Sequence, residues 1–146
     1  GKDIERSRAA ALNIIPSTTG AAKAVVKVIP ELVNRIDGMS LRVPVPTGSF
    51  TDISAVVEKE TTIEDINKVF AGAAEGAMKG ILGIADDVIV SSDIIGSPLS
   101  CIFDPAYTKV IDGHFVKIYG WYDNEWGYST RLVDLVQKLG ENWPQA

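Results

Sequence analysis

Residues that could bind an anion lie where an apolar run passes into an alanine-rich helix. Residues 14–23 read Ile-Ile-Pro-Ser-Thr-Thr-Gly-Ala-Ala-Lys, with Thr18, Thr19 and Gly20 at the predicted helix start. The first turn of a helix has backbone N–H groups without intrahelical partners, and its dipole favours negative charge. The stretch therefore suits either of two roles: a phosphate-sized anion site, or a helix cap formed by Thr18 or Thr19.

A second chemically dense stretch is residues 121–128, Trp-Tyr-Asp-Asn-Glu-Trp-Gly-Tyr. It joins a predicted strand to a predicted helix, where the Asn124 amide and aromatic edges could meet a planar ligand. The alternative is that Asp123 or Asn124 caps the helix while the aromatic residues fill the core. Spacing alone leaves both interpretations open.

The sequence has one thiol and one imidazole, Cys101 and His114. Nucleophilic catalysis requires the nucleophile and its base within hydrogen-bond reach. His114 falls at the tip of a predicted hairpin, and the extended chain between the two residues could span about 30 Å. We therefore interpret Cys101 as a small buried hydrophobe and predict no catalytic residue. A single cysteine also makes no Cys-rich metal site, and we predict no metal.

The elements that must position these residues form an α+β fold: a mixed, largely antiparallel sheet with helices on one face, plus a C-terminal helix. Alternation in residues 39–45 places Arg42 on the face opposite Leu41 and Val43. A capping box at residues 61–64 starts the second helix, which Gly76 ends. Strands are expected at residues 12–15, 39–45, 50–58, 80–84, 88–92, 101–103, 109–111 and 114–122, and helices at 21–29, after 61–64, and at 128–139 before Gly140.

Composition limits the class of protein. A chain of 146 residues suits one domain, or one domain with a small appendage. Its net charge of −5 argues against nucleic acid as the main partner, because binding the polyanionic backbone of a nucleic acid requires a basic surface. No run approaches the ~20 apolar residues of a membrane span, and residues 1–6 show no signal-peptide core. We expect a cytoplasmic protein that binds neither nucleic acid nor membrane.

Four stretches resemble glyceraldehyde-3-phosphate dehydrogenase in the same order and spacing: residues 16–24, 41–48, 91–93 and 121–129. The resemblance covers essentially the whole chain and is to the second half of that enzyme. It implies that residues 1–122 are a partial catalytic domain, which contacts substrate and phosphate. Residues 123–146 are then a C-terminal helix that would pack on an absent nucleotide-binding domain.

The resemblance also implies roles for individual residues. Thr19 and Gly20 are similar to the loop that holds the attacking inorganic phosphate, and Arg42 to the arginine that contacts substrate phosphate. Arg6, with Arg8, stands where the family's arginine-rich loop ends, and we include Arg6 among the phosphate-binding residues.

On the cofactor side, Asn124 is similar to the residue that hydrogen-bonds the nicotinamide carboxamide, and Tyr128 to the aromatic residue beside that ring. The cofactor implied is NAD or NADP, bound by the complete enzyme rather than tightly by this chain. The family's nucleophilic cysteine and partner histidine match neither Cys101 nor His114.

Three functions follow as hypotheses. The first is a fragment of a phosphorylating glyceraldehyde-3-phosphate dehydrogenase, inactive alone, with the phosphorylated aldehyde, inorganic phosphate and the nucleotide-binding half as partners. A homo-oligomer is expected in that case. The second is the equivalent fragment of an erythrose-4-phosphate dehydrogenase. The third, from another class, is a non-catalytic module that binds anions or caps an assembly.

Overall fold

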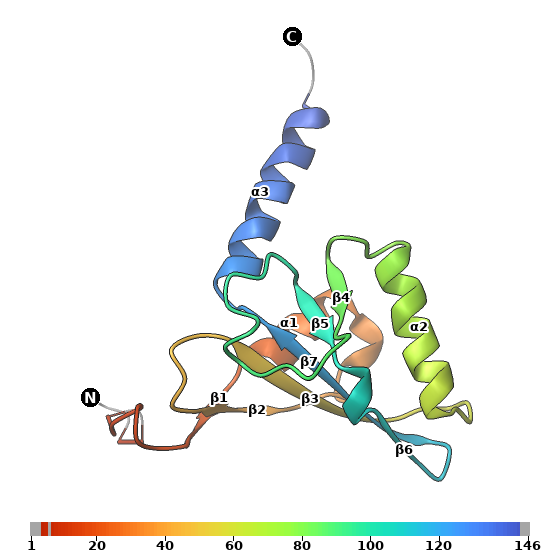
Figure 1. The fold of residues 1–146 in the computed structure, drawn as a ribbon, viewed down its shortest axis with the longest axis horizontal. Helices are drawn as coiled ribbons and strands as arrows, with labels where there is room; N and C mark the ends of the chain where they lie inside the picture. Colours follow the sequence, from red (N-terminus) through yellow and green to blue (C-terminus); the bar gives the residue numbers. More distant parts are fainter. Residues whose placement is uncertain (1–3, 6, 144–146) are drawn as a thin grey trace. The chain divides into compact units, whose positions relative to one another are not determined.

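A computed structural model describes residues 4, 5 and 7–143. The chain divides into two compact units, Gly1–Pro46 and Thr47–Ala146, which are described separately. Figure 1 labels their helices and strands. In the described part of the chain, no helix is both long enough and apolar enough to cross a membrane.

The first unit is built on a two-stranded antiparallel sheet of β1 (Ile15–Thr18) and β2 (Met39–Arg42). Between the strands lie α1 (Ala21–Val28) and the 3₁₀ helix η1 (Pro30–Leu32). Ile15 is the only buried residue among those described in this unit. The unit therefore has almost no apolar core of its own.

Two strand predictions in this unit are wrong in their bounds. The first strand starts at Ile15 rather than residue 12, and Leu12 is 81% exposed. It continues through Pro16, which an edge strand tolerates because one side of its backbone needs no partner. The second strand ends at Arg42 rather than residue 45, since the prolines at 44 and 46 cannot donate to a ladder. The helix predicted at residues 21–29 is confirmed as α1.

The second unit contains a five-stranded sheet in the order β3-β7-β5-β4, with β6 also paired to β7. The β4–β5 pair is parallel and every other pair is antiparallel. This confirms the predicted α+β fold with a mixed, largely antiparallel sheet. The strands are β3 (Ser49–Val56), β4 (Leu82–Ile84), β5 (Cys101–Phe103), β6 (Lys109–Ile111) and β7 (Phe115–Tyr122).

Helix α2 (Ile63–Glu75) lies beside β4 and supplies the main core contact (Figure 1). The rings of Phe70 and Phe103 stack with centroids 4.0 Å apart. The predicted capping box is displaced by one residue. The Thr62 hydroxyl oxygen accepts a hydrogen bond from the Asp65 N–H at 3.1 Å and donates to the Asp65 carboxylate at 2.9 Å.

The strand predicted at residues 88–92 does not form. The Asp93 carboxylate accepts a hydrogen bond from the Val90 N–H at 2.7 Å, and the Asp93 N–H donates to the Val90 carbonyl at 3.0 Å. This local turn takes the backbone groups that a sheet ladder would need, as short acidic side chains often do.

Helix α3 (Trp126–Glu141) starts at the end of β7 and extends away from the sheet (Figure 1). Gly140 does not end it, contrary to the prediction. Its end is marked by Asn142, whose N–H and side-chain amide both donate to the Lys138 carbonyl. Apolar side chains along the helix remain exposed, namely Trp126, Leu132, Val133, Leu135, Val136 and Leu139.

Candidate functional site

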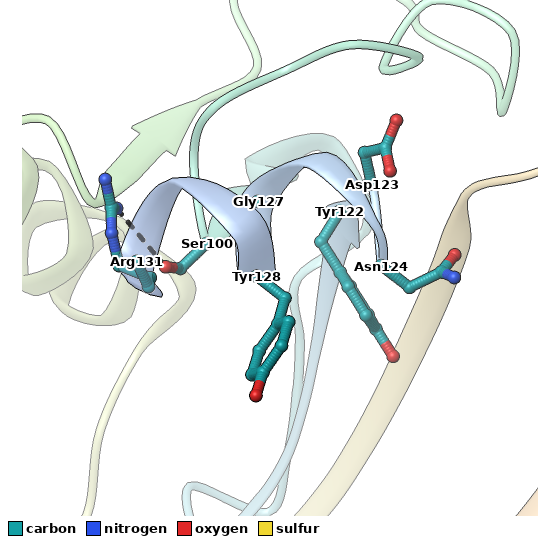
Figure 2. Close-up of a pocket in the computed structure, with 7 residues that line it drawn as sticks. All are labelled: Ser100, Tyr122, Asp123, Asn124, Gly127, Tyr128 and Arg131. Carbon is teal, nitrogen blue, oxygen red and sulfur yellow. Dashed lines mark hydrogen bonds between the residues drawn. The ribbon is translucent and has the colours of Figure 1, made fainter. Parts of the chain in front are cut away.

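A pocket of about 340 Å³ lies in the second unit, where β7 passes into α3 (Figure 2). In Figure 2 the rings of Tyr122 and Tyr128 point to the same side, while the Asp123 carboxylate points away from them. The pocket therefore combines two aromatic rings with amide, hydroxyl and guanidinium groups. It is lined by Ser100, Tyr122, Asp123, Asn124, Gly127, Tyr128 and Arg131.

Asp123 holds the turn that begins α3. It is 4% exposed, and its Oδ1 accepts hydrogen bonds from the N–H groups of Glu125 and Trp126 at 2.9 and 2.8 Å. Its Oδ2 accepts from the N–H of Gly96, 27 residues earlier, at 2.8 Å. The bonds from Trp126, Gly96 and Glu125 lower the pKa of this carboxyl, because N–H donors favour its charged form. Asp123 thus caps the helix and ties it to a distant loop.

The first turn of α3 also approaches the loop before β5 closely. A Cβ added to Gly127 would lie 2.7 Å from the Leu99 carbonyl oxygen and 3.8 Å from the Ser100 Cα. Only glycine allows this approach, because the neighbouring atoms belong to the backbone.

Arg131, one turn further, fastens α3 to the same part of the sheet. Its Nη1 donates to the Gly80 carbonyl at 3.3 Å. The same atom donates to the Ser100 hydroxyl at 3.4 Å (Figure 2). Its Nη2 pairs with the Asp134 carboxylate at 2.7 Å. The Nε atom is buried and has no hydrogen-bond partner in the described part of the chain.

Asn124 follows Asp123 and is exposed, with its Oδ1 3.3 Å from the Ser49 hydroxyl that donates to it. Tyr128 is 65% exposed and Trp126 is 58% exposed. Of the two sequence interpretations, the cap is therefore correct for Asp123, whereas these aromatic residues do not fill the core of this chain. Trp121 and Tyr122 are the exceptions, because both are half-buried, and the Trp121 Nε1 donates to Asp104 at 3.0 Å.

In the first unit, Gly20 is the N-cap residue of α1 and Thr19 directly precedes it. The Thr19 Oγ1 accepts a hydrogen bond from the Ala21 N–H at 3.1 Å. The N–H groups of Ala22 and Lys23 have no hydrogen-bond partner among the described residues. The Thr19 hydroxyl thus satisfies the first N–H of α1, while the next two N–H groups stay without a partner among the described residues.

Arg42 lies directly opposite Ile15 in the β1–β2 register, whereas Thr18 lies opposite Met39. Arg42 is thus three residues, or about 10 Å along the strand, from the position beside Thr18. Alternation places Ser17 on the same face as Arg42. Ser17 was missed by sequence reasoning, and its Oγ is buried without a partner in the described structure. Arg6 lies outside the described residues.

Cys101 and His114 are far apart, as predicted. Ile102 pairs with Trp121, and continuing this register brings Cys101 alongside Tyr122, eight residues or about 26 Å along β7 from His114. Burial raises the pKa of the Cys101 thiol, so it has little thiolate character. In the described ranges, no group of three or more His, Cys, Asp or Glu residues is arranged to hold a metal ion.

One further polar cluster lies on the exposed side of the sheet. Lys117 on β7 donates to both carboxylate oxygens of Asp52 on β3, at 2.8 and 2.9 Å, and to the Ser54 hydroxyl at 2.9 Å. The hydrogen bond to Asp52 raises the pKa of Lys117. Alternation in the sequence predicts which face of its strand each side chain lies on. The Lys117–Asp52 contact depends in addition on the β3–β7 register, which pairs Asp52 with Tyr119. We interpret it as a cross-strand pair that stabilises the sheet.

Comparison with known proteins gives a consistent result. The family model described as "Glyceraldehyde 3-phosphate dehydrogenase, C-terminal domain" matches residues 1–124. Glyceraldehyde-3-phosphate dehydrogenase 2 of Streptomyces avermitilis is 58% identical over 139 residues, which are 95% of this chain and 42% of that protein. The glyceraldehyde-3-phosphate dehydrogenase of Mycobacterium avium is 57% identical over 141 residues, 97% of this chain and 41% of that protein. The chain thus spans about two fifths of the length of these relatives.

Proposed function

The chain belongs to the glyceraldehyde 3-phosphate dehydrogenase C-terminal domain family, and from this membership we propose that it supplies the phosphate and nicotinamide contacts of a phosphorylating aldehyde dehydrogenase. In that reaction a thiolate attacks the aldehyde, and inorganic phosphate releases the product as an acyl phosphate. The bound NAD or NADP accepts the hydride. The thiolate and its partner histidine are not Cys101 and His114, so a chain of these 146 residues is inactive alone.

The observation that carries the proposal is the turn between β7 and α3. Asp123 fixes its backbone with three hydrogen bonds, and this presents Asn124 next to a pocket that Tyr122 and Tyr128 line. An amide beside two aromatic rings suits a planar carboxamide, which needs hydrogen bonds at its edge and apolar contact on its face. These residues therefore fit the nicotinamide end of the cofactor.

The phosphate contacts come from the first unit. Thr19 and Gly20 start α1, where free N–H groups and the helix dipole favour an anion. Arg42 supplies the cation, and a guanidinium binds phosphate through two parallel hydrogen bonds. The unpartnered Ser17 hydroxyl on the same face supports the assignment. Arg6 completes the proposed set.

The chain as a whole is proposed to correspond to two parts of the family's enzyme. We assign residues 1–122 to part of the catalytic domain, and residues 123–146, which include α3, to the segment that a nucleotide-binding domain covers. The exposed apolar side chains of α3 support this assignment, because contiguous apolar surface usually marks an interface. A cytoplasmic homo-oligomer that acts on a phosphorylated aldehyde and inorganic phosphate is the assembly we propose.

Complementation tests this function. The chain is co-expressed with the nucleotide-binding part of the Streptomyces avermitilis relative, and NADH formation from glyceraldehyde 3-phosphate, NAD and phosphate is followed by absorbance. We expect activity from the pair, none from either part, and a loss of at least about tenfold in Asn124→Ala. The Cys101→Ser variant is the matched control and should keep full activity. A stable complex without activity would instead indicate a non-catalytic module.

A further inference from the structure

The same three residues, Ile-Asp-Gly, occur twice in the chain, at positions 36–38 and 111–113. An aspartate before a glycine is able to close a succinimide ring. The glycine nitrogen gives up its proton and bonds to the side-chain carboxyl carbon, and a carboxyl oxygen leaves as water. Water then opens the ring at either carbonyl, which restores aspartate or gives isoaspartate, whose main chain runs through Cβ. Local geometry decides which of the two stretches reacts.

Asp37 and Gly38 lie in the exposed connection between η1 and β2. The Asp37 Oδ1 accepts a hydrogen bond from the Gly38 N–H at 2.8 Å. Because Oδ1 is bonded to Cγ, the nitrogen lies close to the carbon that it attacks, and such proximity lowers the barrier of an intramolecular step. A Cβ added to Gly38 would meet nothing within 4 Å, so no neighbouring group obstructs the ring.

Asp112 and Gly113 form the turn of the β6–β7 hairpin, with φ angles of +51° and +66°. The Gly113 carbonyl accepts a hydrogen bond from the Thr61 N–H at 2.9 Å, and the His114 N–H donates to the Ile111 carbonyl at 3.3 Å. Among the described residues, no hydrogen bond joins the Gly113 N–H to the Asp112 carboxylate. Ring closure here requires the peptide groups of the turn to rotate, which these hydrogen bonds oppose.

A third aspartate separates the effect of geometry from that of glycine. The Asp87 Oδ1 accepts a hydrogen bond from the Val88 N–H at 2.7 Å, and both residues are exposed. The contact is the same as at Asp37, but the valine side chain branches at Cβ and crowds the nitrogen. Of these three pairs, only Asp37–Gly38 combines the short contact with an unobstructed nitrogen.

We infer that Asp37–Gly38 is a site of spontaneous isomerisation to isoaspartate in the folded chain, and that the hairpin protects Asp112–Gly113. Met39 follows directly, starts β2 and pairs with Thr18 at the end of β1. Isoaspartate inserts Cβ into the main chain just before this pair. Since Ile15 is the only buried residue described in this unit, few contacts oppose a change of register. Isomerisation therefore disturbs the β1–β2 ladder next to Thr19.

Isotope incorporation into the full chain tests the inference. The chain is kept at neutral pH in water enriched in ¹⁸O, then digested with trypsin in ordinary water. The two stretches fall in peptides 36–42 and 110–117. Mass spectrometry detects the oxygen taken up when a ring opens, and chromatography separates the isoaspartyl peptide. We expect peptide 36–42 to react about tenfold faster, which corresponds to ~1.4 kcal/mol in activation free energy. Equal rates, or a faster reaction at Asp112, would overturn the inference.

Two controls assign the difference to the fold and to glycine. In urea both stretches should react at similar rates, whereas a preference for Asp37 that persists there would contradict a structural cause. Gly38→Ala should slow the reaction about tenfold. This variant keeps the fold, because its Cβ enters open space and the φ of Gly38 lies outside the left-handed region. An unchanged rate in Gly38→Ala contradicts the inference.

NMR spectra recorded over the same period test the consequence. The Thr18 and Met39 amide signals of the natural sequence should lose intensity as isoaspartate forms, and a second set should appear. Gly38→Ala should keep its original signals over this time. Isoaspartate formation with unchanged signals at both residues would contradict the disturbance of the β1–β2 ladder.

Discussion

The turn that carries Asn124 and the loop that carries Thr19 differ in how many contacts fix them. The turn is fixed by a buried carboxylate, a glycine against backbone and an arginine on a distant carbonyl, all within the second unit. The loop starts an eight-residue helix in a unit whose described residues include one buried side chain. The first is therefore preorganised by this chain, whereas the second has few contacts to oppose its motion.

This difference matches what each proposed ligand group requires. A ring that must present one face to the substrate needs a rigid neighbour, and the contacts of Asp123 provide one. An inorganic phosphate is a compact anion that N–H groups and a flexible arginine bind from several directions. The rigid part of the chain thus coincides with the proposed site that needs orientation.

The largest effect is expected from removing the Asp123 carboxylate. Asp123→Ala leaves three backbone N–H groups without their acceptor, and hydrogen bonds to charged groups contribute about 1.5–3 kcal/mol each. Because these bonds are not additive, we expect the free energy of unfolding of the second unit to fall by about 3 kcal/mol. Urea denaturation followed by tryptophan fluorescence measures it. Glu125→Ala, an exposed carboxylate of the same turn, is the control and should change stability little.

A smaller loss of stability is expected when the pH is lowered. The pKa of Asp123 is lowered in the folded chain, so its stabilisation is fully present above its unfolded pKa of about 3.9. It is lost as the pH falls from there through the folded pKa. The loss is smaller than in the alanine variant, because a protonated carboxyl still accepts hydrogen bonds. Stability measured from pH 6 down to about pH 2 should therefore drop more in the natural sequence than in Asp123→Asn. Parallel curves would show that this carboxyl does not carry the effect.

Phosphate binding at Thr19 and Gly20 should depend on the charge of Arg42. Arg42→Ala should weaken phosphate binding about tenfold, which corresponds to ~1.4 kcal/mol, from a millimolar starting affinity. The amide shifts of Thr19 and Gly20 during a phosphate titration measure it, with Arg35→Ala as the control for nonspecific charge. Shifts that are absent, or equal in the Arg42→Ala variant, would leave Thr19 as a helix cap only.

The sequence predicted the parts of the fold whose signals are local. The Asp112-Gly113 turn signal between two strand-like runs located the β6–β7 hairpin, and helical spacing located α2. The strand predicted at residues 88–92 was wrong, because a side chain one residue later, Asp93, takes its backbone groups. The composition of residues 121–128 indicated a ligand contact or a helix cap, and only the family resemblance assigned nicotinamide to Asn124 and Tyr128. The residues that hold them were not predictable, since Gly96 and Ser49 lie 27 and 75 positions from their partners.

The smallest effect on stability is expected from alanine substitutions at two glycines, Gly127 and Gly140, at opposite ends of α3. Gly127→Ala adds a Cβ 2.7 Å from the Leu99 carbonyl oxygen, and backbone cannot move away as a flexible side chain would. Overpacking of this kind costs about 1–3 kcal/mol, of which the better helix propensity of alanine offsets up to about 1 kcal/mol. We expect a net destabilisation of about 1 kcal/mol. Gly140→Ala is the matched control in the same helix, with nothing within 4 Å of its added Cβ.

The test is therefore whether the two substitutions change the free energy of unfolding in opposite directions. Gly140→Ala should raise stability by up to about 1 kcal/mol through propensity alone, while Gly127→Ala lowers it. Urea midpoints of both variants against the natural sequence measure this. If both substitutions stabilise the chain, the first turn of α3 does not rest on the Leu99 backbone. The turn that carries Asn124 would then be no better held than the loop that carries Thr19.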